Sequence, residues 1–444
     1  MVNSPMISAR LLPLLLWASV LPAQNQLTLD EAVRMALVKH PSLEAAAARI
    51  KASESRIEQA RSGWMPKVAF QESYQRGNNP VYVFGALLTQ RQFTEANFNI
   101  RGLNRPGALN NFQSQLVADQ TIYDFGATSS GIRAASIARQ LSDEERKALE
   151  QQVISGVARA YHGVTLAKAA LAVAEEGLKS AEADMNRART VRDAGMATDA
   201  DVLSIQVHVS AMREQQIRRK YDVEIGMAAL NEALGLPLDT QHQLTSPLTA
   251  AKPAAEAPSL NRAELRQVRL MEDLAGEHAK QARAQRLPMI GFRGIIETDR
   301  QQFVNKGGAN WMIAASLKWN LFDGNRAKQM QKEAGHQAAA ARATEKQLQS
   351  ALSLQVRKAR TDLLAAQERI NVTQATVAQA EESQRILRNR YSNGLATVTD
   401  ILRADTALLD ARTRRLAAIY DQRMAAISLD AAAGTLNGAS DVLK

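Results

Sequence analysis

Histidine and cysteine are the residue types most able to bind a metal or to act in catalysis. The chain has no cysteine, which excludes thiolate metal sites and disulfide bonds. It also has no GxxxxGK[ST], GxGxxG or GxSxG motif for holding a nucleotide or a catalytic serine. The six histidines are scattered, without a pair at metal-ligand spacing: His40, His162, His208, His242, His278 and His336. The sequence therefore predicts a protein that is not an enzyme and has no catalytic, metal or cofactor site.

A strand-like stretch, NWMIAASLKWNLFDG at residues 310–324, carries apolar side chains at alternate positions. If it is extended, Trp311, Ile313, Leu317 and Trp319 share one face. The two tryptophans stand eight residues apart. That separation is about 26 Å at roughly 3.3 Å per residue, close to the apolar band of an outer-membrane barrel. This face therefore either meets lipid or covers one side of a small soluble sheet.

Composition and charge narrow the class of protein and its compartment. Aromatic residues make up only 5% of the chain, and Ala, Gln, Arg, Glu and Leu are abundant, which favours long helices. The net charge is +10, but basic and acidic residues are interleaved, which predicts a solvated helix surface and no nucleic-acid partner. Residues 1–23 resemble a cleaved export signal, with a buried N-terminal helix as the alternative. No later stretch reaches the ~18 apolar residues of a membrane helix, so any membrane span must consist of strands.

The second half of the chain repeats the first. ARSGWMPKVAF (60–70) matches ARAQRLPMIGF (282–292) at an offset of 222 residues. NFQSQLVADQTIYDFG (111–126) matches NWMIAASLKWNLFDGN (310–325) at an offset of 199, so the first half carries 23 extra residues. They fall in the segment 76–110, which is rich in Asn, Gly and Phe and lacks helical periodicity. We expect this segment to be a loop.

Each half is predicted to run helix, strand, loop, strand, very long helix, tight turn, helix. Residues 126–193 and 325–392 keep heptad-like patterning without proline, and 68 residues at 1.5 Å each would make a rod of about 100 Å. Four strands cannot close a membrane barrel, so several chains must contribute if the strands lie in lipid. The expected divisions are a signal peptide, a first repeat, a connecting segment, a second repeat and a tail: 1–23, 24–235, 236–260, 261–437 and 438–444. Within the connecting segment, the Pro/Ala-rich residues 245–260 are expected to be exposed.

Several motifs together resemble the outer-membrane efflux proteins of the TolC type. They are the start LTLDEAVRMALVKHPSL, the strand-to-helix junctions QTIYDFG and WNLFDGN, and the duplicated turns AGMATDADVL and NGLATVTDIL, within a resemblance that covers residues 26–437. The resemblance implies a mainly α fold with a membrane β part: each chain gives four β-strands to a trimeric 12-stranded β-barrel, and its long helices form a periplasmic α-barrel.

The same resemblance implies a function and partners. The protein would be an outer-membrane exit duct for efflux or type I secretion, a homotrimer in contact with outer-membrane lipid. A periplasmic adaptor protein and an inner-membrane pump would be its partners. The alternative is a long-helix structural or adaptor protein of the cell envelope that has no channel.

The duplicated turns hold the candidate site. Gly195 and Gly394 are expected to end helices in the left-handed conformation. Thr198 and Thr397 each precede a carboxylate by three residues, the spacing of a capping box. The resemblance implies that the adaptor contacts these turns at Gly195, Met196, Ala197, Gly394, Leu395 and Ala396.

The resemblance also implies a periplasmic gate. Asp201 and Tyr391 match residues that link neighbouring hairpins in the closed tunnel, and we predict that the Tyr391 phenol donates a hydrogen bond to the Asp201 carboxylate. Asp400 matches an acidic ring at the narrowest point. Two positions depart from the family pattern: Ala396 replaces an expected arginine and Arg403 replaces a second ring acid. We expect Arg403, one helical turn after Asp400, to pair with it. Helix capping alone is the alternative role for these acids.

Overall fold

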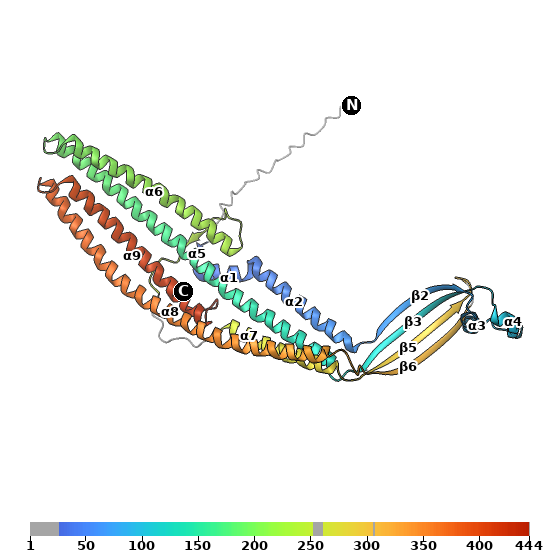
Figure 1. Ribbon diagram of the computed structural model, residues 1–444. Helices are drawn as coiled ribbons and strands as arrows, with labels where there is room; N and C mark the ends of the chain where they lie inside the picture. The colour runs from blue at the N-terminus through green and yellow to red at the C-terminus, as the bar shows by residue number, and fades with distance from the viewer. Residues whose placement is uncertain (1–25, 252–260, 305–306, 444) are drawn as a thin grey trace, which may run out of the picture.

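The computed structural model describes residues 26–251, 261–304 and 307–443. The molecule is elongated, with a bundle of long helices at one end and a four-stranded sheet at the other (Figure 1). The predicted signal peptide, residues 1–23, lies outside the described residues. None of the described helices combines the length and the apolar character needed to cross a membrane.

Two long helical hairpins form the bundle. α5 (Ala127–Asp193) and α8 (Arg326–Ser392) have 67 residues each, about 100 Å at 1.5 Å per residue. Each turns back into a helix of 36 residues, α6 (Asp199–Leu234) or α9 (Val398–Ala433). The hairpins lie side by side with their turns at the same end of the molecule (Figure 1). The predicted long helices are confirmed to within one residue at each end.

Shorter helices continue the bundle towards the sheet. α1 (Leu29–Lys39) and α2 (Pro41–Arg61) pack along α5, and α7 (Ala263–Ala284) packs along α8 and α5. Single 3-10 turns, η1 (Ser62–Trp64) and η3 (Asp441–Leu443), follow α2 and α9. Each half therefore places helix before its strand pair and a long helical hairpin after it, as the internal duplication predicts, with two short helices, α1 and α2, in the first half where the second has α7.

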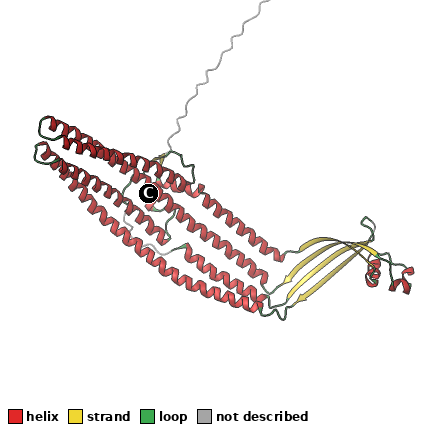
Figure 2. Cartoon of the chain, turned by 45° about the horizontal axis from the view of Figure 1, so that its top comes forward, coloured by secondary structure: helices red, strands yellow, loops and turns green. Residues whose placement is uncertain are grey.

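The sheet is built from one strand pair of each half. β2 (Lys67–Gly77), β3 (Leu109–Tyr123), β5 (Met289–Arg300) and β6 (Gly308–Lys318) are antiparallel in the order β2-β3-β5-β6. Figure 2 shows them as a single curved layer that leaves the end of the helical bundle. β2 and β6 are the edge strands, and within the described chain each pairs on one side only.

A second, very small sheet closes the core in the middle of the bundle. β1 (Gln26–Leu27) pairs in parallel with β4 (Gln243–Leu244). The fully buried Tyr161 fixes this pair, because its hydroxyl donates to the Leu27 carbonyl (2.8 Å) and accepts from the Ser246 N–H (3.0 Å). The main apolar core surrounds it, with residues from α1, α5, α6 and α9.

The connection between the halves is anchored to the bundle at one buried residue. Its described part contains β4 and ends at Ala251, which is buried. The Ala251 N–H donates to the Gln422 side chain (2.7 Å), and the same side chain donates back to the Ala251 carbonyl (3.0 Å). The residues from Thr245 to Ala250 are exposed or half-buried, as predicted, and only Ala251 is buried; residues 252–260 lie outside the described chain.

The insertion between β2 and β3 is not a structureless loop. It folds into α3 (Pro80–Thr89), the 3-10 turn η2 (Glu95–Phe98) and α4 (Ile100–Asn104). Asn79 caps α3 by accepting from the N–H groups of residues 81 and 82, and proline fits the first helical position. Asn79, one of the Asn residues that suggested a loop, is thus a helix-start signal.

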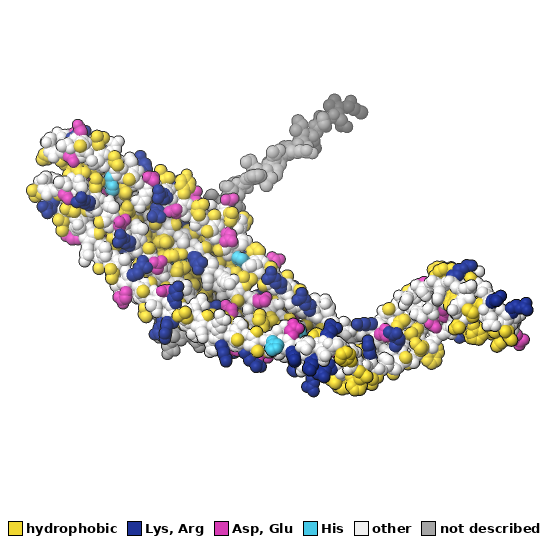
Figure 3. All heavy atoms as spheres, in the orientation of Figure 1, with side chains coloured by type: hydrophobic (Ala, Val, Ile, Leu, Met, Phe, Trp, Pro, Cys, Tyr) yellow, Lys and Arg dark blue, Asp and Glu magenta, His cyan; other side chains and the backbone are white. Residues whose placement is uncertain are grey.

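Charges cover the helical surface without separating by sign. The face in Figure 3 shows Lys and Arg side chains interspersed with Asp and Glu along the bundle. Many of them form pairs on one helix, such as Arg385 with Glu382. This distribution is the expected solvated helix surface.

Candidate functional site

Both hairpins turn with the same local geometry at their tips. Gly195 and Gly394 have φ angles of +75° and +71°, where a Cβ atom is disfavoured. The predicted left-handed helix ends are therefore confirmed. The next side chains, Met196 and Leu395, are 68% and 66% exposed in the isolated chain. Each tip thus presents an apolar side chain outward.

A capping box starts the returning helix after each turn. Thr198 accepts from the Asp201 N–H (3.2 Å), and the Asp201 carboxylate accepts from the Thr198 N–H (3.0 Å). Thr397 and Asp400 make the same two bonds at 3.3 Å and 2.9 Å. Both boxes satisfy N–H groups that would otherwise be unpaired at the helix start.

The predicted hydrogen bond between Tyr391 and Asp201 is not formed. The Tyr391 hydroxyl is buried and has no hydrogen-bond partner in the part of the chain that the structure describes. Its ring packs with Ile205 and Ile401, while the Asp201 carboxylate accepts from the Thr198 hydroxyl (2.8 Å). Burial raises the pKa of Tyr391, and the neighbouring Asp201 carboxylate raises it further. The local cap therefore holds the acid that the link would have used.

Asp400 and Arg403 interact electrostatically, but among the described contacts they form no salt bridge. The Asp400 carboxylate is bonded to the N–H and hydroxyl of Thr397. These bonds hold the pKa of Asp400 below its usual value, and the Arg403 and Arg390 guanidinium groups add smaller contributions. The negative charge at this position is therefore fixed at neutral pH and partly offset by nearby cations.

An ion cluster that the sequence did not reveal joins the two hairpins near their tips. Arg388 of α8 donates to Asp184 of α5 (2.8 Å) and to Asp405 of α9 (3.0 Å). It also donates to the Ser180 hydroxyl, and Gln384 donates to Asp405 (2.7 Å). The Asp184 and Asp405 side chains are only 3% and 8% exposed. One guanidinium thus ties together three helices from both hairpins.

Burial and neighbouring charges shift the pKa values of two groups in and beside this cluster. Burial raises the pKa of Asp184, and the Arg388 guanidinium opposes that shift by stabilising the carboxylate. His208 of α6 lies 3.9 Å from Asp405, and burial lowers the pKa of its imidazole. The cluster borders a cavity of about 210 Å³. Because the carboxylates are buried, removal of the guanidinium would leave them uncompensated.

A second link between the hairpins is more exposed. Arg412 of α9 contacts Glu176 of α5 (2.7 Å) and Glu381 of α8 (2.9 Å). Both glutamates are largely solvated, so this link contributes little compared with the Arg388 cluster. A sequence signal for the stronger cluster exists, because Asp184 lies between Ala181 and Ala188 on the buried stripe of α5. A charge on an apolar stripe needs a partner from the facing helix.

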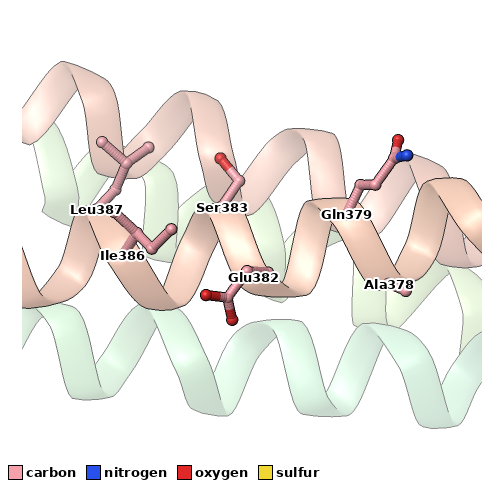
Figure 4. A pocket seen from close by; sticks show the side chains of 6 residues that line it. All are labelled: Ala378, Gln379, Glu382, Ser383, Ile386 and Leu387. Atoms are coloured by element: carbon pink, nitrogen blue, oxygen red, sulfur yellow. The ribbon is translucent and has the colours of Figure 1, made fainter.

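A shallow groove runs along one face of α8 close to the tip (Figure 4). Its lining is mixed, and Ile386 in it is 44% exposed. All of its lining comes from α8: Ala378, Gln379, Glu382, Ser383, Ile386 and Leu387.

One face of the sheet is apolar. Because of the strand register, side chains from all four strands align in rows, one of which consists of Phe70, Leu116, Ile296 and Trp311. Ile313 and Leu317 follow Trp311 on the same face and are 62% and 63% exposed in the isolated chain. Trp319 lies just beyond the end of β6, and its indole N–H donates to the Arg286 carbonyl (3.1 Å). The predicted alternation of β6 is thus present, continued across the sheet.

A polar row ends this apolar face on the side away from the helices. Glu72 and Ser114 lie in the row next to that of Trp311. Arg300, from the row after that, pairs with Glu72 (2.9 Å) and donates to Ser114 (2.6 Å). The guanidinium also lies over the Phe303 ring, 5.8 Å from its centroid. Charged and aromatic side chains therefore mark the outer limit of the apolar rows.

The opposite face of the sheet is polar. Arg293 pairs with Asp119 across β5 and β3 (2.6 Å). Glu297 accepts from Gln113 (3.2 Å) and Gln115 (2.7 Å). The sheet is therefore amphipathic, with one face suited to lipid and the other to water.

Comparison with known proteins decides the family. The sequence matches the family described as "Outer membrane efflux protein" over residues 32–236 and 257–435. The chain belongs to the outer membrane efflux protein family. Among relatives, protein CyaE of Bordetella pertussis is 26% identical over 98% of this chain and 90% of the CyaE chain. Outer membrane protein TolC of Escherichia coli K12 is 23% identical over 96% of this chain and 87% of the TolC chain.

A solved structure gives the same fold for this member of the outer membrane efflux protein family. The outer membrane protein VceC of Vibrio cholerae has a TM-score of 0.76 at 19% identity, over 91% of this chain and 96% of its own. The predicted fold class, outer-membrane location and TolC-type resemblance are confirmed. The protein is an outer membrane efflux protein and not an enzyme.

Proposed function

We propose that three copies of this efflux-family chain assemble into one channel, each giving its four strands to a shared barrel of twelve. The observation that carries this proposal is the amphipathic sheet with two open edges, β2 and β6. Unpaired backbone groups cost several kcal/mol each in lipid, so these edges must pair with other chains. The face of Trp311, Ile313, Leu317 and Trp319 then meets lipid, and the face of Arg293 and its neighbours lines the lumen.

The helical hairpins extend this lumen into the periplasm. Their length of about 100 Å is roughly three times the hydrocarbon thickness of a bilayer. An adaptor protein and an inner-membrane pump engage the far end, and the pump drives the transport of substrates for efflux or type I secretion. The adaptor contacts the six turn residues, which are Gly195, Met196, Ala197, Gly394, Leu395 and Ala396.

The tips form the gate of the channel. Within each chain the Arg388 cluster holds the hairpins together, and the buried Tyr391 ring packs beside Asp201 between them. Asp400 contributes a fixed negative charge close to the opening, which Arg403 partly offsets. Separation of the two hairpins, repeated in three chains, opens the gate.

Export and chain organisation complete the proposal. Residues 1–23 direct export and are removed, so the mature chain begins near Gln24. The repeats 24–235 and 261–437 each supply one strand pair and one long hairpin. The segment 236–260 connects them, and residues 438–444 form the tail.

The test is to purify the full chain from the envelope of a Gram-negative host. We expect it in the outer-membrane fraction as an SDS-resistant trimer that dissociates on heating, with an intact mass lacking residues 1–23. In planar bilayers the trimer should conduct ions. A monomer recovered from the soluble periplasm that forms no channels would contradict the proposal and indicate a structural long-helix protein.

A further inference from the structure

The insertion between β2 and β3 packs against the end of the sheet that is farthest from the helices. Figure 1 shows α3 and α4 there. Gln90, just after α3, is 2% exposed and donates to the Asn110 carbonyl (2.8 Å) and to the Asn111 side chain (2.9 Å). Asn111 in turn donates to Asp299, which is 1% exposed (2.6 Å). These buried polar contacts fix the end of α3 on β3 and β5.

Further contacts reach β6 and β2. Arg91 donates to the Ala309 carbonyl (2.8 Å), and the Asn310 side chain donates to the Thr89 carbonyl (3.3 Å). Gly308 faces the same carbonyl so closely that a Cβ atom there would lie 1.9 Å from the Thr89 oxygen. At the other end of α3, the Tyr82 hydroxyl donates to the Gln75 carbonyl (3.0 Å). α3 therefore lies across all four strands.

The side of the sheet that α3 covers follows from strand alternation. Side chains of successive residues point to opposite faces. Asn111, Asp299 and Asn310 are each one residue away from Phe112, Arg300 and Trp311, which lie on the apolar face. Their side chains therefore stand on the polar face. The apolar contacts of α3 lie on the same face. Val83 and Ala86 pack on Leu109, which is two residues from Asn111 in β3 and therefore points to the same side of the sheet.

The outer part of the insertion adds bulk above α3. The rings of Phe84, Phe93 and Phe98 stack edge to face, with centroids 4.9 Å and 5.2 Å apart. A cavity of about 250 Å³ lies between α3 and the η2–α4 segment. The inner part is thus held firmly on the strands, and the outer part is packed more loosely.

We propose that residues 78–108 form a constriction over the exit of the channel, which limits the size of the solutes that leave it. This inference rests on the proposed function, in which the polar face lines the lumen. A segment anchored on that face at the far end of the strands stands in the path of the solute, once in each chain. Its charged residues make the constriction positive, because Arg91, Arg101 and Arg105 outnumber Glu95.

The test compares single-channel currents of the full-length assembly and its variants in planar bilayers. Gly77 and Leu109 are paired, so a short Gly/Ser turn can replace residues 78–108 and close the hairpin directly. This variant should conduct about twofold more or better, since pore diameter sets conductance, and should admit larger uncharged polymers and prefer anions less. The anchor variant Gln90→Ala with Asn310→Ala should change the current in the same direction.

The matched control is Gln92→Ala with Asn104→Ala, in the same insertion. Neither of these amides bonds to the strands among the described contacts, so parental conductance is expected. If the shortened hairpin fails to assemble, a thiol probe replaces it, because the chain has no native cysteine. A charged thiol reagent should reduce the current of Val81→Cys, which is 81% exposed on α3, and leave Ile313→Cys unchanged.

The outcomes separate the two proposals. If the parental assembly conducts, but neither the shortened hairpin nor labelling at Val81→Cys changes the conductance or the polymer cut-off, the constriction is overturned. The proposed function is not affected by that outcome. Absence of any channel from the parental assembly would overturn the proposed function on which the constriction depends.

Discussion

Replacement of Arg388 by methionine is expected to loosen the contact between the hairpins without unfolding either one. The guanidinium stands between two carboxylates that are 3% and 8% exposed. Removal of one partner from a buried ion pair costs about 3 to 5 kcal/mol. Arg388 itself is 24% exposed, so solvent screening reduces the expected loss to about 2 to 3 kcal/mol per chain.

This loss should appear in the equilibrium between joined and separated hairpins. Every 1.4 kcal/mol is a tenfold change, so the separated population should rise about 30- to 140-fold. The defect should shrink in acid, because burial already raises the pKa of Asp184. A carboxyl group whose pKa is higher in the joined state than in the separated state binds a proton more readily when the hairpins are joined. As the pH falls through that pKa, protonation therefore stabilises the joined state, because a neutral carboxyl group no longer needs its cation.

The assay is the open fraction of single channels, measured beside the matched control Arg385→Met. Arg385 is one turn away on the same helix, is 62% exposed and pairs only locally with Glu382. A double-mutant cycle of Arg388→Met with Asp184→Asn should give a coupling of about 1.5 to 3 kcal/mol. Equal open fractions for the two arginine variants, with coupling near zero, would refute the role of the cluster.

Three further predictions follow from burial and backbone geometry. Leu317→Arg should destabilise the assembly by about 2 to 4 kcal/mol and Ser316→Arg far less, because only the former faces lipid in the proposed barrel; equal unfolding midpoints would count against that orientation. Gly434→Ala should destabilise more than Gly394→Ala, because both have positive φ but only at the former would the Cβ lie 2.3 Å from a carbonyl oxygen. Burial lowers the pKa of His162 from 6.5 to about 4, so stability by helical circular dichroism should fall as the pH drops through that window. That loss is about 3 kcal/mol and should be absent in His162→Leu.

The architecture could be predicted from the sequence because it depends on patterns that repeat. The duplication, the proline-free heptads of α5 and α8, and the alternation in β6 each specify an element locally. Gly195 and Thr198 likewise specify their turn without reference to distant residues. For such features the nearest neighbours in the chain decide the conformation.

The contacts between hairpins could not be predicted in the same way. Arg388, Asp184 and Asp405 lie on three helices, and their meeting depends on which helix faces pack together. The predicted hydrogen bond from Tyr391 to Asp201 is not formed, because Thr198, only three residues away, binds the Asp201 carboxylate instead. A local cap costs less chain entropy than a contact between hairpins, so it holds the carboxylate.

α3 was missed because its start signals, Asn79 and Pro80, are also typical of loops. The buried contacts that stabilise it come from the strands, through Gln90 and Asn111. A helix of 10 residues is marginal by itself and needs such packing. Its sequence alone therefore does not specify it.

In the proposed channel, the polar face of the sheet lines a conducting lumen and the apolar face meets lipid. The most direct measurement is single-channel current during modification with a cationic thiol reagent, since the chain has no cysteine of its own. Ser316→Cys and Leu317→Cys place the thiol on adjacent residues of β6 and on opposite faces. We expect a stepwise change of conductance for Ser316→Cys and an unchanged current for Leu317→Cys. A change at Leu317→Cys with none at Ser316→Cys would contradict it.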